Sequence, residues 1–266
     1  MRHRPTPTFD ELLDFAHQLA RLTGPVILPH FRQQITVDNK AGEGAYDPVT
    51  IADRAAEQVI RRHIAEHYPS HAIVGEEFGR SDSADPHSWI IDPIDGTRSF
   101  VVGLPTWGTL IGLARDGVPL LGLVDQPFTG ERFFSSADAA HFDGPGGSRT
   151  LRTRPCARLA DALAATTSPD MFSGIDREHF LAVKSRARMM RYGGDCLNYC
   201  LLAMGQIDLV IECGLQTYDI AALIPIIERA GGIVTTWEGK PALDGGRIVA
   251  AGDRRMHDEV LGIVNR

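Results

Sequence analysis

The chain has 266 residues, 43% of them apolar and 23% charged, and its 27 lysines and arginines against 34 aspartates and glutamates give a formal net charge of −7. This composition is typical of a globular protein and excludes a disordered or fibrous chain. The acidic balance argues against nucleic acid as a partner, because nucleic-acid binders concentrate basic residues on one surface. No apolar run approaches the roughly 20 residues that a membrane-spanning helix needs, so we expect no membrane partner either.

The first residues are polar and rich in proline, and no apolar stretch follows that would indicate a secretory signal. The four cysteines, at positions 156, 196, 200 and 213, include no C-x-x-C pair. A chain of this length buries a sufficient core without disulfides. We therefore expect reduced thiols in a cytoplasmic protein.

Two helices open the predicted fold. Thr8 and Glu11 have the spacing of a capping box, and apolar residues follow them at helical intervals. Residues 50–67 form a second amphipathic helix, with Thr50 and Asp53 in capping positions.

Short apolar strands follow, at residues 73–74, 89–91, 110–114, 120–124 and 132–135. The Arg-Asp-Gly turn at 115–117 joins the third and fourth of them as a hairpin. A glycine-rich break at 144–147 predicts a domain boundary, which divides the chain into an N-terminal α+β subdomain, 1–147, and a C-terminal α/β subdomain, 148–266.

Strands and helices alternate in the second half, which is typical of an α/β arrangement. The strands are expected at 209–212, 233–237 and 247–251, and the helices at 196–204, 219–230 and 254–264. Pro225 lies inside the second of these helices, so we expect that helix to be kinked or strained in its first half.

The sharpest chemical signal is the segment 89–97, which reads Trp-Ile-Ile-Asp-Pro-Ile-Asp-Gly-Thr. A buried strand runs there directly into Asp92 and Asp95, and two carboxylates with a backbone carbonyl between them are ligands that Mg²⁺ prefers. Gly96 lets the backbone approach a ligand closely, and Thr97 can begin a helix whose N–H groups face a phosphate. The alternative is that both aspartates are ordinary turn and capping residues.

Further carboxylates follow nearby elements. Glu76 and Glu77 come directly after a short strand, and a solvated loop is the alternative for such a pair. Asp47 and Asp53 flank the start of the second helix, where a capping role alone would explain Asp53.

Three segments together resemble the inositol monophosphatase family of metal-dependent, lithium-sensitive phosphatases. They are Gly-Glu-Glu at 75–77, the segment 89–97, and Tyr-Asp-Ile-Ala-Ala at 218–222 followed by Glu-Arg-Ala-Gly-Gly at 228–232. The resemblance covers nearly the whole chain. It implies an α/β fold, the layered αβαβα sandwich of the inositol monophosphatase and fructose-1,6-bisphosphatase type, together with a homodimer and on the order of two or three Mg²⁺ ions in each active site.

Carried over residue by residue, the resemblance implies five metal ligands, namely the side chains of Glu76, Asp92, Asp95 and Asp219 and the carbonyl of Ile94. Asp53 and Thr97 become catalytic, because they would activate the attacking water, with Glu76 as a third catalytic residue. Glu77 and Asp47 would support the ligand shell.

The chemistry of the reaction agrees with this division. Phosphate monoesters hydrolyse very slowly, so an enzyme must neutralise the phosphate and generate a nucleophile near neutral pH. We expect direct attack by a metal-activated water, with the N–H groups of Gly96 and Thr97 orienting the phosphate. The sequence lacks the D-x-D motif of phosphatases that form an aspartyl intermediate.

The alcohol side of a small phosphorylated substrate is assigned to the second half of the chain. Gly193, Gly194 and Asp195 precede a helix there, and Glu212 ends a strand. Their small size and negative charge favour substrate binding, whereas the alternative is a glycine turn followed by Asp195 as a helix N-cap.

The same positions bear on the substrate class. Inositol phosphatases carry small or hydroxyl residues where Gly194 and Asp195 stand, and a Trp where Tyr218 stands. The segments 192–200 and 211–219 instead resemble histidinol-phosphate phosphatases of the inositol-monophosphatase type. Two carboxylates suit an ammonium group better than a neutral polyol. We therefore predict hydrolysis of L-histidinol phosphate to L-histidinol and phosphate, a step of histidine biosynthesis.

Three alternatives stay open. They are a broad-specificity inositol-1-monophosphatase, a 3′(2′),5′-bisphosphate nucleotidase and, from a different class, an inactive binding protein with a phosphatase fold. The complete acidic set argues against the last. Lys40 lies in a glycine-flanked loop that can close over a site, but an ordinary exposed loop is the favoured interpretation.

Overall fold

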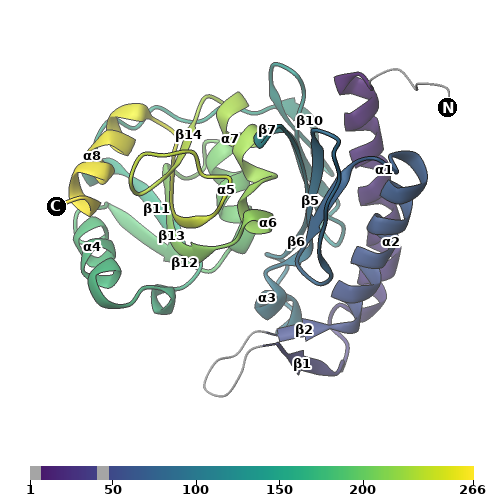
Figure 1. Ribbon diagram of the computed structural model, residues 1–266. Helices are drawn as coiled ribbons and strands as arrows, with labels where there is room; N and C mark the ends of the chain where they lie inside the picture. The colour runs from purple at the N-terminus through teal and green to yellow at the C-terminus, as the bar shows by residue number, and fades with distance from the viewer. Residues whose placement is uncertain (1–6, 41–47) are drawn as a thin grey trace.

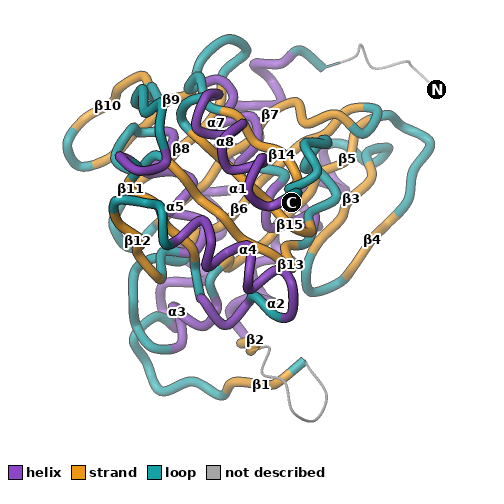
Figure 2. Tube along the Cα trace, turned by 90° about the vertical axis from the view of Figure 1, so that its left-hand side faces the viewer, coloured by secondary structure: helices purple, strands orange, loops and turns teal. Residues whose placement is uncertain are grey.

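The structure is a computed structural model, and it describes residues 7–40 and 48–266. Figure 1 shows successive layers of helices and sheets: α1 and α2, a large sheet, the helices α5, α6 and α7, a smaller sheet, and finally α4 and α8. The predicted α/β sandwich with αβαβα layers is therefore confirmed. Figure 2 views the same stack from the outer side of the smaller sheet.

The first layer consists of α1 (Phe9–Ile27) and α2 (Ile51–His67). Thr8 caps α1 and Thr50 caps α2, each in a complete capping box, as the sequence predicts. The apolar faces of both helices pack on the large sheet, in a core that is rich in aliphatic residues and centred on Trp89. These contacts hold the start of α2, and with it Asp53, against the sheet.

The large sheet has eight strands in the order β10-β9-β8-β7-β6-β5-β3-β4. They are β3 (Ala72–Gly75), β4 (Gly79–Ser81), β5 (His87–Asp95), β6 (Gly108–Arg115), β7 (Val118–Gln126), β8 (Glu131–Ser135), β9 (Ala140–Gly144) and β10 (Gly147–Thr150). Only the pair β3 and β5 is parallel within this sheet, so both strands deliver their following residues to one edge. The predicted hairpin turn is confirmed, with Asp116 at φ 52° and Gly117 at φ 74°.

A small ribbon, β1 (Val37–Asn39) and β2 (Pro48–Thr50), leads into α2 below the short helix α3 (Thr97–Val101) (Figure 1). The glycine-rich segment 144–147 turns the chain from β9 into β10, so the large sheet continues to Thr150. The division into subdomains 1–147 and 148–266 stays a prediction.

The smaller sheet has five strands in the order β12-β11-β13-β15-β14. They are β11 (Leu163–Thr166), β12 (Met189–Tyr192), β13 (Leu209–Leu215), β14 (Ile233–Thr236) and β15 (Gly246–Ala251). The helices α4 (Gly174–Lys184) and α8 (Arg254–Val264) pack on its outer face. The middle layer consists of α5 (Asp195–Ala203), α6 (Thr217–Ile220) and α7 (Leu223–Arg229), whose core fills the space between the sheets.

The helix expected over 219–230 is interrupted in its first half, where a kink or strain is predicted, and the chain forms two helices, α6 and α7, with a break at 221–222. Pro225 has no N–H to bond to the carbonyl of residue 221, so it is accommodated in the first turn of α7. The break also packs tightly on the large sheet, where a Cβ on Gly122 would collide with the carbonyl oxygen of Ala222. The break ends α6 one residue after Asp219.

Candidate active site

Most of the predicted site residues line a cleft of about 420 Å³ between the large sheet and the middle helices, whereas Gly193 and Gly194 are not among its lining residues. Those that line it are Glu76, Asp92, Ile94, Asp95, Gly96, Thr97, Asp195, Glu212 and Asp219. Asp53 contacts the hydroxyl of Thr97, and Glu77 shares the ammonium group of Lys40 with Glu76. Asp47 falls outside the described residues, so its predicted supporting role stays a prediction.

Carboxylates of Asp92, Asp95 and Asp219 form the centre of the cleft, with oxygen atoms within 4.8 Å of one another. Burial raises the pKa values of Asp92 and Asp95 well above the usual range of an aspartate, and repulsion from neighbouring carboxylates adds to this rise. Burial also raises the pKa of Glu76, whose side chain bonds to Asp92. A buried set of hard oxygen donors fits Mg²⁺, which would relieve this repulsion.

Local geometry fixes these ligands. The register of β5 shifts between Asp92 and Asp95, and Asp92 Oδ1 accepts the N–H of Ile94 at 3.0 Å. Gly96 follows at φ 84°, in the left-handed region that favours glycine, and starts α3. Asp219 accepts the N–H of Gln216 at 2.6 Å in the capping box of α6, which holds its carboxylate at the start of that helix.

We expect Mg²⁺ to stabilise the protein, and more so as the pH rises. The raised pKa of Asp92 and Asp95 means that metal-free protein loses stability as the pH rises through those values, because the folded state then holds uncompensated charge. The Tm values in EDTA and in Mg²⁺ should therefore diverge as the pH rises above about 4, the pKa of an aspartate in the unfolded chain. A Mg²⁺ effect on Tm that shrinks over this range would contradict the assignment.

Asp53 is fully buried, and its two carboxylate oxygens face different partners. Its Oδ2 accepts from the N–H of Thr50 at 2.8 Å and from the Thr50 hydroxyl at 2.5 Å, which completes the capping box. Its Oδ1 lies 3.4 Å from the Thr97 hydroxyl. That hydroxyl also lies 3.1 Å from the carbonyl of Ile94, and its single proton can serve one acceptor at a time.

Lys40 contacts the site through its ammonium group, which the interpretation as an ordinary exposed loop did not anticipate; residues 41–47 of that loop lie outside the described residues. Its ammonium lies 2.8 Å from Glu76 Oε1 and 2.6 Å from Glu77 Oε1. The side chain of Glu77 is only 2% exposed, so it is not in a solvated loop. Lys40 therefore offsets part of the negative charge next to the Asp92 cluster.

Glu57 is a further residue that the sequence analysis missed. It is fully buried in α2 and accepts the backbone N–H groups of Glu77 at 2.7 Å and Phe78 at 3.1 Å. A Cβ on Gly75 would collide with it. The Gly-Glu-Glu segment thus turns over a buried carboxylate, which explains why glycine precedes the two glutamates.

The substrate side of the cleft contains Asp195 and Glu212. Gly193 and Gly194 adopt left-handed φ values of 81° and 114°, and Gly194 is the N-cap of α5. The alternative of Asp195 as N-cap is wrong, because its Oδ2 accepts the hydroxyls of Ser99 at 2.6 Å and Thr106 at 2.8 Å.

Glu212 is 2% exposed and is held at both oxygens. Oε1 accepts the N–H of Thr167 at 2.7 Å, and Oε2 accepts the hydroxyl of Tyr199 at 2.9 Å. Burial raises the pKa of Glu212, and these two donors oppose that rise. Glu212 and Asp195 together line the cleft on the side of the smaller sheet.

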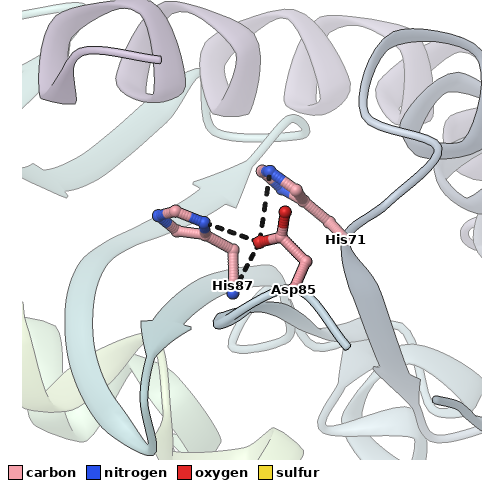
Figure 3. Close-up of side chains that lie close together, drawn as sticks. All are labelled: His71, Asp85 and His87. Carbon is pink, nitrogen blue, oxygen red and sulfur yellow. Dashed lines mark hydrogen bonds and ion pairs between the residues drawn. The ribbon is translucent and has the colours of Figure 1, made fainter. Parts of the chain in front are cut away.

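A second group of possible metal ligands lies at the opposite ends of β3 and β5 from Glu76 and Asp92. Figure 3 shows Asp85 between His71 and His87. Asp85 Oδ1 lies 2.9 Å from His87 Nδ1 and 3.9 Å from His71 Nε2. The two rings stack with centroids 4.8 Å apart and an angle of 21° between their planes.

Three features favour a hydrogen-bonded cluster here over a metal centre. Trp89 Nε1 donates to His71 Nδ1 at 3.1 Å, so the neutral ring carries its proton on Nε2, which leaves no lone pair there for a metal. Burial lowers the pKa of His71 to about 4, which keeps this ring neutral. The rings of His71 and His87 are also nearly parallel. The lone pairs of their nitrogen atoms lie in the ring planes, so they do not point toward one common ion.

Asp85→Asn is accordingly expected to lower the free energy of unfolding by about 1 kcal/mol, through weaker bonds to His87 and Ser70, and to leave phosphatase activity within about twofold. Chemical denaturation and initial rates measure both. A Zn²⁺-induced rise in Tm that is present in the wild type and absent in Asp85→Asn would show a metal centre instead.

The four cysteines are free, as predicted, and all four are buried. Among residues 7–40 and 48–266, no helix combines the length and apolar character needed to cross a membrane.

Comparison with known proteins places the chain in a defined family. Residues 9–266 match the inositol monophosphatase family, and the chain belongs to that family of metal-dependent phosphatases, whose usual cation is Mg²⁺. A chloroplastic bifunctional phosphatase of Arabidopsis thaliana is 41% identical over 270 residues, which covers 95% of this chain and 74% of the relative. A histidinol-phosphatase of Mycobacterium tuberculosis is 37% identical, over 82% of this chain and 85% of the relative.

Solved structures agree on the fold. An inositol monophosphatase from Zymomonas mobilis superposes with a TM-score of 0.87 at 39% identity, over 98% of this chain and 100% of that chain. The predicted family is therefore confirmed, and the protein is a phosphatase. Because both histidinol and inositol phosphatases are among these similar proteins, family membership leaves the alcohol of the substrate open.

Proposed function

We propose that the protein is a Mg²⁺-dependent histidinol-phosphatase that acts in histidine biosynthesis. The observation that carries the proposal is the position of Asp195, a half-buried carboxylate that lines the acidic cleft together with Glu212. An ammonium group on the substrate would form a charge-assisted hydrogen bond there, which a neutral polyol cannot form. The similarity to a histidinol-phosphatase of Mycobacterium tuberculosis supports the same substrate.

The side chains of Glu76, Asp92, Asp95 and Asp219 and the carbonyl of Ile94 would hold two or three Mg²⁺ ions. Bound there, the ions would supply charge neutralisation for the phosphate and would acidify water.

Thr97 and Asp53 would complete the catalytic group. The Thr97 hydroxyl would orient the attacking water, and Asp53 Oδ1 would take its proton through that hydroxyl. Burial raises the pKa of Asp53, which makes its carboxylate a stronger base than an exposed aspartate. The N–H groups of Gly96 and Thr97 would orient the phosphate oxygens at the start of α3. Water would attack the phosphorus directly, so no side chain of the protein acts as the nucleophile.

Complementation tests the proposal in a cell. A bacterial strain without its own histidinol-phosphatase should grow without histidine when it expresses this chain, and should not grow when it expresses the Asp219→Asn variant. Growth that needs added histidine in spite of soluble, folded wild-type protein would contradict the proposal.

A broad-specificity inositol-1-monophosphatase is the second candidate, favoured by the similarity to the Zymomonas mobilis enzyme. The cytoplasmic location and the homodimer stay predictions. Light scattering of the purified protein measures its oligomeric state.

A further inference from the structure

We propose that Ser99 and Thr106 are positioning residues that fix the orientation of Asp195, and that they thereby set a preference for phosphate esters of amino alcohols. The inference rests on the proposed function, because it takes Asp195 as the group that faces the alcohol. It adds two residues that have no direct part in binding the phosphate.

The two hydroxyls converge on one atom. Ser99 Oγ donates to Asp195 Oδ2 at 2.6 Å, and Thr106 Oγ1 donates to the same oxygen at 2.8 Å. Neither bond uses Oδ1, although the residue lines the cleft. Among the residues that the structure describes, the carboxylate is thus held by one oxygen, and Oδ1 can accept a donor in the cleft.

The backbone of Asp195 requires such support. Its φ of 45° lies in the left-handed region, which a residue other than glycine adopts uncommonly. Such a conformation persists only when surrounding contacts determine it. The hydroxyls of Ser99 and Thr106, from segments 96 and 89 residues away in the chain, provide these contacts.

The position of Asp195 is also set relative to the phosphate side of the cleft. The next residue, Cys196, donates its N–H to Asp95 Oδ2 at 2.7 Å. A Cβ on Gly96 would lie 2.8 Å from Asp195 Cγ, so the carboxyl group packs directly on the start of α3. These contacts bring Asp195 close to the acidic cluster, so it suits a cationic group only a few bonds from the phosphate ester oxygen.

The charges that face Asp195 agree with this role. Burial raises the pKa of Asp195, whereas the hydroxyls of Ser99 and Thr106 and the guanidinium of Arg98 oppose that rise. The two hydroxyls therefore orient the carboxylate and also favour its ionised form, which an ammonium group requires.

The test compares two esters in the wild type and in the double variant Ser99→Ala/Thr106→Val. One ester is histidinol phosphate, and the other has the same skeleton with hydrogen in place of the ammonium group. We expect the ratio of their kcat/KM values to fall by about tenfold, mainly through a higher KM for the amino ester. The ester without the ammonium group should stay within about twofold.

The conservative variants Ser99→Thr and Thr106→Ser keep both hydroxyls and should keep the wild-type ratio. Equal losses on both esters, or an unchanged ratio in the double variant, would overturn the inference. If the double variant does not fold, Thr106→Val alone provides the same comparison. A wild type with no preference for the amino ester would instead refute the proposed function, so the two failures are distinguishable.

Discussion

Replacing Asp92 with asparagine is expected to lower kcat/KM for phosphate release by about 10³-fold or more. Asp92 is 2% exposed at the centre of the acidic cluster, next to Asp95 and Asp219. Asparagine has nearly the same shape and can still accept the N–H of Ile94, so the change removes mainly one negative charge. Initial rates over a Mg²⁺ titration measure the effect, with Asp85→Asn as the matched control outside the site.

The same variant is expected to be more stable than the wild type when no metal is bound, although its activity is lower. Asp92 is repelled by its neighbours in metal-free protein, so Asp92→Asn should have a higher Tm than the wild type in EDTA. The rise in Tm on adding Mg²⁺ should then be smaller than in the wild type. Wild-type activity, or an unchanged Mg²⁺ effect on Tm, would remove Asp92 from the ligand set.

Thr97→Val is expected to lower kcat by about 10²-fold, because valine retains the shape of threonine without its hydroxyl. This hydroxyl lies between Asp53 Oδ1 and the carbonyl of Ile94, at 3.4 Å and 3.1 Å. The loss should fall on kcat more than on the Mg²⁺ concentration for half-maximal rate, since no proposed metal ligand is removed.

Thr97→Ser keeps the hydroxyl and provides the matched control, with a kcat expected within about fivefold of the wild type. Presteady-state and steady-state rates of phosphate release separate the chemical step from product release. Equal losses in Thr97→Val and Thr97→Ser would show that packing at this position matters and that the hydroxyl does not.

Local patterns in the sequence predict the parts of the fold that depend on near neighbours. Thr50 and Asp53 are three residues apart, and their capping box forms as expected. The irregular end of β5 and the start of α3 are likewise defined by adjacent residues, from Asp92 to Gly96. Short-range hydrogen bonds fix these segments whatever packs around them.

Contacts between distant segments account for what the sequence does not predict. Lys40 lies 36 residues from Glu76, and Ser99 lies 96 residues from Asp195, so no local pattern links them. The break between α6 and α7 depends on glycines of the large sheet that allow Ala222 to approach closely. Asp195 is a further example. Its residue type and position favour a helix N-cap, but the hydroxyls of Ser99 and Thr106, which are distant in the sequence, determine its orientation.

The central claim is that the acidic cleft hydrolyses a phosphate monoester whose alcohol carries a positive charge near the ester. The most direct test is kcat/KM for Mg²⁺-dependent phosphate release from histidinol phosphate, inositol-1-phosphate and 3′-phosphoadenosine phosphate, assayed in parallel. We expect histidinol phosphate to exceed both others by at least about tenfold, the factor that one charge-assisted hydrogen bond supplies, and EDTA to abolish all three rates. An equal or higher kcat/KM for inositol-1-phosphate would contradict the account.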